Sequence, residues 1–297
     1  MIAPPTDMTD RSLPPLVLGA TGRIGTGFQR LVQAGLWPGP PPVWQVRPGV
    51  ARPAGGVLDW DMLGPDDAPD LSFHGIFCLA GVVAGPVDLN TALALAAIDL
   101  AQRRGGGPVL LTSTAAVYGP VAGPVDERAA CNPLGPYGRA KLAMEDAVAR
   151  HLDRLGAAAP AVCILRIGNV AGADVLLLQA AQGRVSLDQF DGGAGPVRSY
   201  IGMQSLALVM LRLIGLATTG PVLPPVLNLA APDPVAMEDL LQEADVPWDW
   251  QAAPATALAR MTLDTRLLTS LVPLGPESAT PAELIRQARL TGWSARR

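Results

Sequence analysis

The chain has 297 residues, enough for one large α/β domain or two ordinary domains. Hydrophobic residues make up 49% and charged residues 16% of the chain, which excludes an intrinsically disordered protein. The net charge of -4 and the lack of any Lys/Arg block exclude a typical nucleic-acid or anionic-membrane binder, so we expect a globular protein whose partner is a small molecule.

Short apolar segments alternate with amphipathic segments along the chain, a pattern typical of βαβ units in a parallel sheet. Each apolar segment is hydrophobic on both faces, as a sheet covered by helices on both sides requires. The expected strands are Leu16–Leu18, Val43–Val46, Gly75–Leu79, Val109–Thr112, Val162–Arg166 and Val226–Leu229. The expected helices are Ile24–Leu36, Val87–Arg104, Tyr137–Leu155, Val175–Gln182 and Gln204–Leu216.

A glycine-rich turn joins the first expected strand to the first expected helix. It reads Gly19-Ala20-Thr21-Gly22-Arg23-Ile24-Gly25, with the spacing G-x-x-G-x-x-G. Glycine lets the backbone approach a pyrophosphate closely, and a helix N-terminus offers free N–H groups and a favourable dipole. The turn residues expected to bind a dinucleotide are Gly19, Thr21, Gly22, Arg23, Ile24 and Gly25.

The predicted fold class is α/β, a doubly wound parallel Rossmann sheet with a smaller, discontinuous C-terminal substrate lobe. The alternation of strands and helices weakens after Gly168, so we expect the dinucleotide-binding domain to span residues 12–168, with residues 203–231 returning to it. Residues 169–202 and 232–297 are expected to form the smaller lobe. Asp249–Arg297 carry no motif that we can interpret.

The residue after the second expected strand bears on the choice of cofactor. Arg47 stands there and favours NADP over NAD, because arginine suits a 2′-phosphate whereas an acidic residue would hold the ribose hydroxyl. A merely solvated Arg47 is the alternative. Asp59 is expected to meet the adenine edge, or else to cap a turn.

Lysine and tyrosine are rare in this chain. Lys141 is the only lysine, against 21 arginines, and Tyr137 is one of three tyrosines. The two lie four residues apart in an expected helix and therefore share one face of it. A nearby ammonium group favours the phenolate and is expected to lower the pKa of Tyr137 toward neutrality. Tyr137 can then exchange a proton with a substrate oxygen while a hydride is transferred.

Cysteine and histidine are scarce, and the three cysteines share no CxxC spacing. Neither a disulfide framework nor a metal site is therefore expected. Residues 1–15 lack the basic start and apolar core of a signal peptide. The longest apolar run, Leu206–Ala217, is interrupted by Arg212 and is too short to span a bilayer. These features predict a cytoplasmic protein without membrane contact.

The motifs together resemble those of a known family. The sequence Thr114-Ala115-Ala116-Val117-Tyr118-Gly119 follows an expected strand, and Tyr137-x-x-x-Lys141 and Arg166-Ile167-Gly168-Asn169 come later. With the glycine turn, they resemble the extended short-chain dehydrogenase/reductases, the family of the NAD-dependent sugar epimerases and dehydratases. The resemblance covers Leu16 to roughly Ala230.

The resemblance implies roles for individual residues. Thr114, Tyr137 and Lys141 would be catalytic, with Thr114 bonded to the reacting oxygen and Lys141 also holding the nicotinamide ribose. Further cofactor contacts would come from Leu79, Ala80 and Gly81. Substrate contacts are expected from Ser113, Tyr118, Asn169 and Arg198, the last in a segment that resembles a diphosphate clamp. An ordinary surface role for Arg198 is the alternative.

The expected function is that of an NAD(P)-dependent oxidoreductase or epimerase acting on a hydroxyl or keto group of a sugar-derived substrate, nucleotide sugars included. The alternative is a non-catalytic NAD(P)-binding sensor of the same fold. The Tyr137/Lys141 pair favours the enzyme, because such sensors commonly lose it. The family usually dimerises through the helices expected at Val87–Arg104 and Tyr137–Leu155, so a homodimer is expected.

Overall fold

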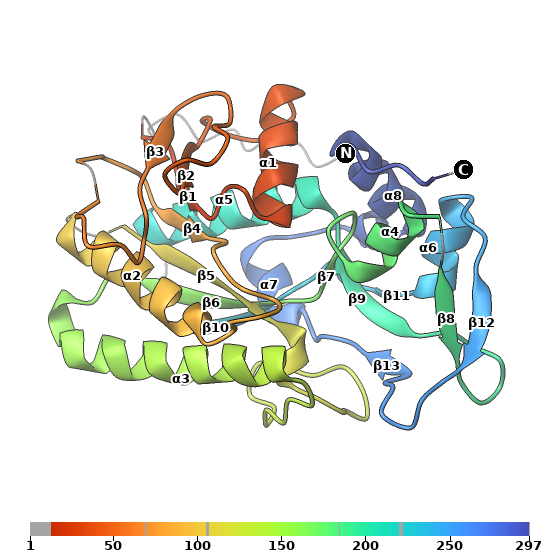
Figure 1. The fold of residues 1–297 in the computed structure, drawn as a ribbon. Helices are drawn as coiled ribbons and strands as arrows, with labels where there is room; N and C mark the ends of the chain where they lie inside the picture. The colour runs from red at the N-terminus through yellow and green to blue at the C-terminus, as the bar shows by residue number, and fades with distance from the viewer. Residues whose placement is uncertain (1–12, 69, 105–106, 184, 220–221, 297) are drawn as a thin grey trace.

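The computed structural model describes residues 13–296, apart from residues 69, 105–106, 184 and 220–221 (Figure 1). Most of the segment to which the signal-peptide expectation refers, residues 1–12, lies outside the described residues. None of the helices in the described ranges is both long and apolar enough to cross a membrane.

Seven parallel strands form the central sheet, in the order β10-β6-β5-β4-β1-β2-β3 (Figure 1). They are β1 (Leu16–Leu18), β2 (Val43–Val46), β3 (Val57–Asp59), β4 (Ile76–Cys78), β5 (Val109–Thr114), β6 (Val162–Ile167) and β10 (Val226–Leu229). The chain winds outward from β1 through β2 to β3, and then outward on the other side from β4. This order confirms the predicted doubly wound α/β fold and puts a switch point between β1 and β4.

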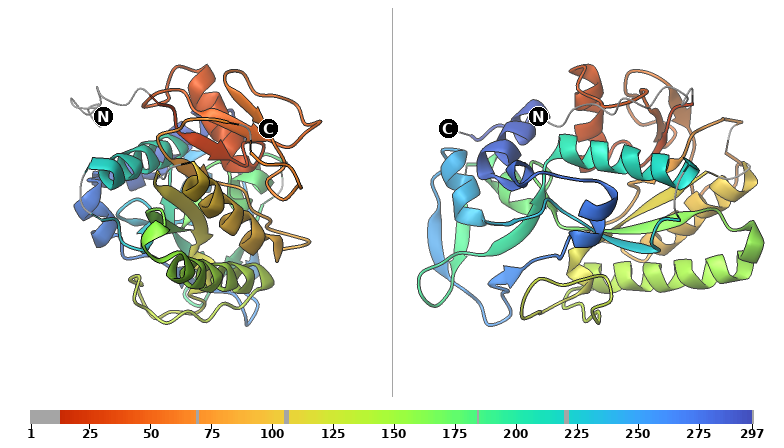
Figure 2. Two further views of the ribbon diagram at one scale, coloured as in Figure 1. Left: turned by 90° about the vertical axis from the view of Figure 1, so that its left-hand side faces the viewer. Right: turned by 180° about the vertical axis from the view of Figure 1, so that it is seen from behind.

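Helices cover both faces of the sheet (Figure 2). One face carries α1 (Arg23–Gln33) and α5 (Met203–Thr219), and the other carries α2 (Leu89–Arg103) and α3 (Pro136–Leu155). Alternation along β1 explains why its residues are all apolar: Val17 belongs to the core under α1 and α5, whereas Leu16 and Leu18 belong to the core under α2 and α3.

A second lobe is built around a four-stranded sheet beside the carboxyl ends of the central strands (Figure 1). Its strands are β7 (Asn169–Val170), β9 (Val197–Ile201), β11 (Pro234–Ala236) and β13 (Arg260–Met261), and β8 (Ser186–Gln189) pairs separately with β12 (Asp249–Ala252). The remaining helices are α4 (Val175–Ala180), α6 (Met237–Glu243), α7 (Arg266–Leu271) and α8 (Pro281–Leu290).

The C-terminal segment contributes to both parts of the molecule. Leu284 and Ile285 of α8 join the core of the second lobe. Leu268 of α7 and Val272 instead join the core of the central sheet, where α7 packs against β10. The predicted residue limits of the two domains stay a prediction.

A buried ion pair joins α3 to β6. The Arg166 Nη2 atom lies 2.7 Å from Glu145 Oε2, with side chains only 8% and 6% exposed. Ser113 on β5 donates its hydroxyl to Glu145 Oε1 at 2.5 Å. The Arg166 guanidinium also lies 4.8 Å from the centroid of the Tyr118 ring. These contacts hold α3 against the carboxyl ends of β5 and β6.

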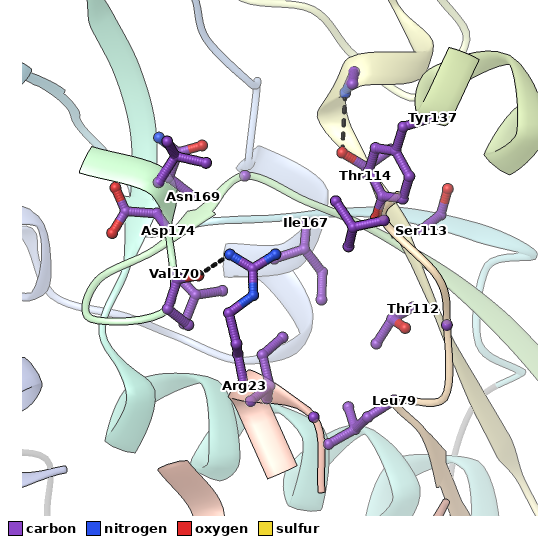
Figure 3. A pocket seen from close by; sticks show the side chains of 18 of the residues that line it. Arg23, Leu79, Thr112, Ser113, Thr114, Tyr137, Ile167, Asn169, Val170 and Asp174 are labelled. Atoms are coloured by element: carbon purple, nitrogen blue, oxygen red, sulfur yellow. Dashed lines mark hydrogen bonds between the residues drawn. The ribbon is translucent and has the colours of Figure 1, made fainter. Parts of the chain in front are cut away.

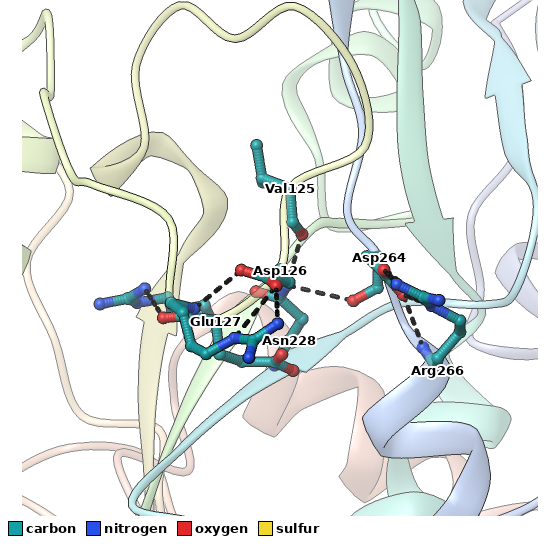
Figure 4. Close-up of polar contacts among 8 residues, drawn as sticks. Val125, Asp126, Glu127, Asn228, Asp264 and Arg266 are labelled. Carbon is teal, nitrogen blue, oxygen red and sulfur yellow. Dashed lines mark hydrogen bonds and ion pairs between the residues drawn. The ribbon is translucent and has the colours of Figure 1, made fainter.

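A second polar network surrounds Asn228 on β10 (Figure 4). Its Nδ2 donates to the carbonyl oxygens of Val125 at 2.8 Å and Asp264 at 3.1 Å. Its Oδ1 accepts the hydroxyl of Tyr118 at 2.7 Å, and its backbone N–H donates to Glu127 Oε1 at 2.9 Å. The network ties the loop after β5 to the C-terminal segment.

We predict that Glu145→Gln lowers the free energy of unfolding by about 3–5 kcal/mol, because Arg166 would keep a buried charge without its partner. Asp70→Asn is the control, since Asp70 pairs with Arg104 but its side chain is 96% exposed. This control should cost at most about 1 kcal/mol. Urea unfolding of both variants gives the comparison, and equal losses would contradict the role of the buried pair.

Candidate active site

Two cavities flank the glycine turn between β1 and α1. The smaller cavity has a volume of about 400 Å³ and the larger one about 710 Å³. Of the predicted cofactor residues, the smaller cavity is lined by Gly19, Thr21, Gly22, Arg47, Leu79, Ala80 and Gly81. The larger cavity is lined by Thr21, Gly22, Arg23, Ile24, Gly25, Leu79, Gly81 and Lys141.

The glycines of the turn are required by close approaches of the backbone. Gly19 has φ +81°, and a Cβ atom there would lie 2.6 Å from the backbone of Ala80. A Cβ atom on Gly25 would lie 2.4 Å from the Ala20 carbonyl oxygen. Gly22 precedes α1 without a side-chain cap, so the first N–H groups of this helix have no side-chain partner at the cap. An uncapped helix start behind a glycine cradle fits a pyrophosphate.

The smaller cavity lies beside the end of β2. Gln45 is buried, accepts the Gly19 N–H at 2.9 Å and donates to the Trp60 carbonyl at 2.5 Å. Arg47 is exposed at the cavity wall, and Asp61 lies on the same wall. Sequence reasoning missed Gln45 and Asp61 as lining residues.

Asp59 is not among the described residues that line either cavity, and its expected contact with adenine stays a prediction. Leu58 faces the core, so the neighbouring Asp59 side chain points to the opposite side of β3 and forms an ion pair with Arg52. Asp61 comes two residues later, beyond the strand, and lines the smaller cavity. An acidic residue two positions after the end of the strand is the signal that could have identified it.

The larger cavity brings together Thr114, Tyr137 and Lys141 (Figure 3). Thr114 ends β5 and accepts the Ala116 N–H on its Oγ1 atom at 3.2 Å. Tyr137 lies in the first turn of α3, with its ring beside Thr114 (Figure 3). Lys141 follows one turn later and is only 3% exposed.

The electrostatic environments of Lys141 and Tyr137 in the larger cavity differ from those expected from the sequence. Lys141 Nζ donates to the Thr112 carbonyl at 2.8 Å, and burial lowers the pKa of Lys141 to about 8. Burial raises the pKa of Tyr137, and the charge that counteracts this rise is the Arg23 guanidinium. The expectation that Lys141 moves the pKa of Tyr137 toward neutrality is therefore wrong for this structure, because the ammonium group is turned to a carbonyl of β5.

Arg23 differs from the rest of the turn in the direction of its side chain. The guanidinium enters the larger cavity and its Nη1 donates to the Ala173 carbonyl at 2.8 Å, between the Tyr137 and Asp174 sides of the cavity (Figure 3). Asp174 precedes α4, and its carboxylate accepts the Tyr200 hydroxyl at 3.2 Å. Burial raises the pKa of Asp174 to about 6.

The structure separates the four residues expected to contact substrate. Asn169 and Ser113 line the larger cavity, but the Ser113 hydroxyl is donated to Glu145. Tyr118 is only 1% exposed and is not among the lining residues, because its hydroxyl is donated to Asn228 inside the protein.

Arg198 likewise is not among the described residues that line the larger cavity. Its guanidinium donates to the carbonyl oxygens of Val197 at 2.9 Å and Leu258 at 2.7 Å. These neutral partners come from β9 and from the C-terminal segment, which sequence reasoning left uninterpreted. The resemblance of the Arg198 segment to a diphosphate clamp therefore does not extend to the direction of this side chain in the structure.

Comparisons with known proteins agree with this fold. Residues 82–185 match the sequence model of the NAD dependent epimerase/dehydratase family. A UDP-glucose 4-epimerase from Azospirillum brasilense is 39% identical over 112 residues, which cover 35% of this chain and 30% of that protein.

Solved structures match over nearly the whole chain. UDP-glucose 4-epimerase from Brucella ovis, in complex with NAD, has a TM-score of 0.77 at 20% identity, covering 96% of this chain and 100% of that chain. The Stenotrophomonas maltophila UDP-glucose 4-epimerase with bound NAD and formylated UDP-arabinopyranose has a TM-score of 0.73 at 18% identity, covering 94% and 98%. The match to the NAD dependent epimerase/dehydratase family therefore covers residues 82–185, and the solved structures show that the chain shares their fold over nearly its whole length.

Proposed function

We propose that the protein is an NAD(P)-dependent oxidoreductase or epimerase acting on a hydroxyl or keto group of a sugar-derived substrate, nucleotide sugars included. The observation that carries this proposal is the meeting of Thr114, Tyr137 and Lys141 on one cavity that also reaches the glycine turn. The similarity to proteins named UDP-glucose 4-epimerase supports a nucleotide sugar as substrate.

Tyr137, Thr114 and Lys141 have different roles in the proposed reaction. A bound dinucleotide supplies the hydride acceptor or donor. Tyr137 takes a proton from the substrate alcohol, or returns it to a carbonyl. The Thr114 oxygen already accepts the Ala116 N–H, so its hydroxyl proton is available to the same substrate oxygen. Lys141 lies one turn deeper, where its ammonium can hold a ribose hydroxyl.

The choice of dinucleotide depends on Arg47 in this proposal. The solved relatives described above contain NAD. Here the exposed Arg47 lines the smaller cavity, and a guanidinium in that position favours a 2′-phosphate. This residue supports NADP as the preferred cofactor.

A sensor without catalysis is the second candidate, and one observation favours it. The Lys141 ammonium donates to the Thr112 carbonyl, and burial raises the pKa of Tyr137, so the lysine does not activate the phenol in the protein without ligand. The homodimer expected through α2 and α3 stays a prediction.

Tyr137→Phe should abolish turnover of UDP-glucose while cofactor affinity stays within about a few-fold, because the ring is kept and only the proton-transfer group is lost. Tyr118→Phe is the matched control and should retain turnover, since the Tyr118 hydroxyl bonds to Asn228 rather than facing the cavity. Steady-state kinetics and cofactor titration test both variants. Full activity of Tyr137→Phe would exclude Tyr137 as the general acid/base.

The rate at which the protein oxidises an alcohol substrate should increase as the pH rises. Since burial raises the pKa of Tyr137, the phenolate is the minor form at neutral pH, and its fraction grows about tenfold per pH unit below that pKa. We expect kcat/KM for oxidation to rise between pH about 6 and about 7, below the pKa of about 8 at which Lys141 loses its charge. The absorbance of the reduced nicotinamide follows the rate. A profile that falls over this range would be inconsistent with phenolate as the base.

Arg47→Asp should weaken NADP binding by about tenfold more than NAD binding, because the variant places an acid where the 2′-phosphate would lie. Arg52→Gln is the control: Arg52 pairs with Asp59 and is not among the residues that line the smaller cavity. Isothermal titration with each dinucleotide gives the ratio. Equal losses for NAD and NADP would remove Arg47 from cofactor selection.

A further inference from the structure

The backbone and the side chain of Arg23 serve different sites. Its backbone opens α1 behind the glycine cradle, where a pyrophosphate fits. Its side chain lines the larger cavity, with Tyr137 and Thr114, and is absent from the lining of the smaller cavity. The guanidinium is therefore directed to the reaction side of the turn, toward the second lobe (Figure 3).

Among the residues that the structure describes, the charge of Arg23 has no acidic partner. Its one hydrogen bond among the described residues goes to the neutral Ala173 carbonyl, and no described ion pair includes it. Asp174 is next in sequence to Ala173, but one of its oxygens accepts the Tyr200 hydroxyl and the other is buried without a hydrogen bond. A guanidinium has five N–H donors, so Arg23 keeps most of them for another group.

The other cations near the larger cavity have different partners. Of its described lining residues, only Arg23 and Lys141 are positively charged. Lys141 is buried and donates to the Thr112 carbonyl. Arg198 is committed to backbone carbonyls and is not among the lining residues. Arg23 is more than a third exposed, so its donors are accessible to a molecule that enters the cavity.

We propose that Arg23 binds an oxyanion of the substrate, a carboxylate or a phosphoryl group, close to the oxygen that exchanges its proton with Tyr137. This inference rests on the proposed function and narrows the substrate to an acidic or phosphorylated sugar derivative. Guanidinium binds both groups through paired, charge-assisted hydrogen bonds. The same charge acts on Tyr137, so an anion seated on Arg23 also changes the electrostatic environment of the phenol.

The test compares two nucleotide sugars on the NAD-saturated, full-length protein. UDP-glucuronic acid carries a carboxylate on its sugar and UDP-glucose does not, whereas both carry a diphosphate. Isothermal titration of Arg23→Gln should show the affinity for UDP-glucuronic acid reduced about tenfold or more. Unchanged affinity for UDP-glucose identifies the carboxylate as the anion, and a parallel loss for both identifies the phosphoryl group.

Two further variants test whether the loss of affinity is specific to the Arg23 guanidinium. Arg23→Lys keeps the positive charge and should retain more affinity than Arg23→Gln. Arg139→Gln removes an exposed arginine of α3 that bonds to the Leu134 carbonyl, and it should leave both affinities unchanged.

Three outcomes would overturn the inference. They are unchanged affinity of Arg23→Gln for both nucleotide sugars, a loss of NAD affinity as large as the loss of sugar-nucleotide affinity, and no binding of either nucleotide sugar to the wild-type protein. The second outcome would assign Arg23 to the cofactor phosphates. The first two outcomes leave turnover by the wild-type protein intact, so they are distinct from a failure of the proposed function, which shows as absent turnover. The third outcome contradicts both proposals.

Discussion

The buried ion pair between Glu145 on α3 and Arg166 on β6 fixes the helix that carries Tyr137 and Lys141. An isolated buried charge is costly, so this pair specifies one position of α3 relative to the sheet. Ser113 extends the contact to β5, one residue before Thr114. Thr114 and the ring of Tyr137 therefore lie side by side because the charge pair holds α3 against β5 and β6.

The position of the cavity follows from the topology. The winding reverses between β1 and β4, which leaves a crevice at the carboxyl ends of the strands. The glycine turn closes one side of this crevice, and β7 and α4 of the second lobe close the other. Arg23 spans the gap with its bond to Ala173, so one residue of the turn contacts both the proposed cofactor site and the proposed substrate site.

Much of the fold could be predicted because the buried strands are apolar on both faces. β1, β2 and β10 occupy the predicted residues. The edge strand β3 was not predicted, because it has only three residues and only Leu58 among them is buried. β13 has two residues and exists through its pairing with β9, a long-range contact that no local pattern reveals.

The chain positions of the candidate site residues could also be predicted from the sequence. The glycine spacing and the Tyr137/Lys141 pair identified backbone positions, and the structure brings these to one crevice. The directions of side chains were not accessible, since they depend on partners distant in sequence. Arg198 turns to the Leu258 carbonyl, and Lys141 turns to the Thr112 carbonyl. Asp59 is the last residue of β3, and Asp61 lies two residues beyond it. The sequence does not show where the strand ends, so it could not tell which of the two lines the cavity.

The three tyrosines allow a direct measurement of the central claim, that Tyr137 lines the site where the dinucleotide reacts. Tyr118 and Tyr200 are almost fully buried in other cores, so NMR of isotope-labelled tyrosine should resolve Tyr137 as the residue that responds to ligand. The account predicts that saturation with NAD or NADP shifts the Tyr137 resonance and leaves that of Tyr118, which is not among the residues that line the cavity, nearly unchanged. A dinucleotide that binds without moving the Tyr137 resonance would contradict it.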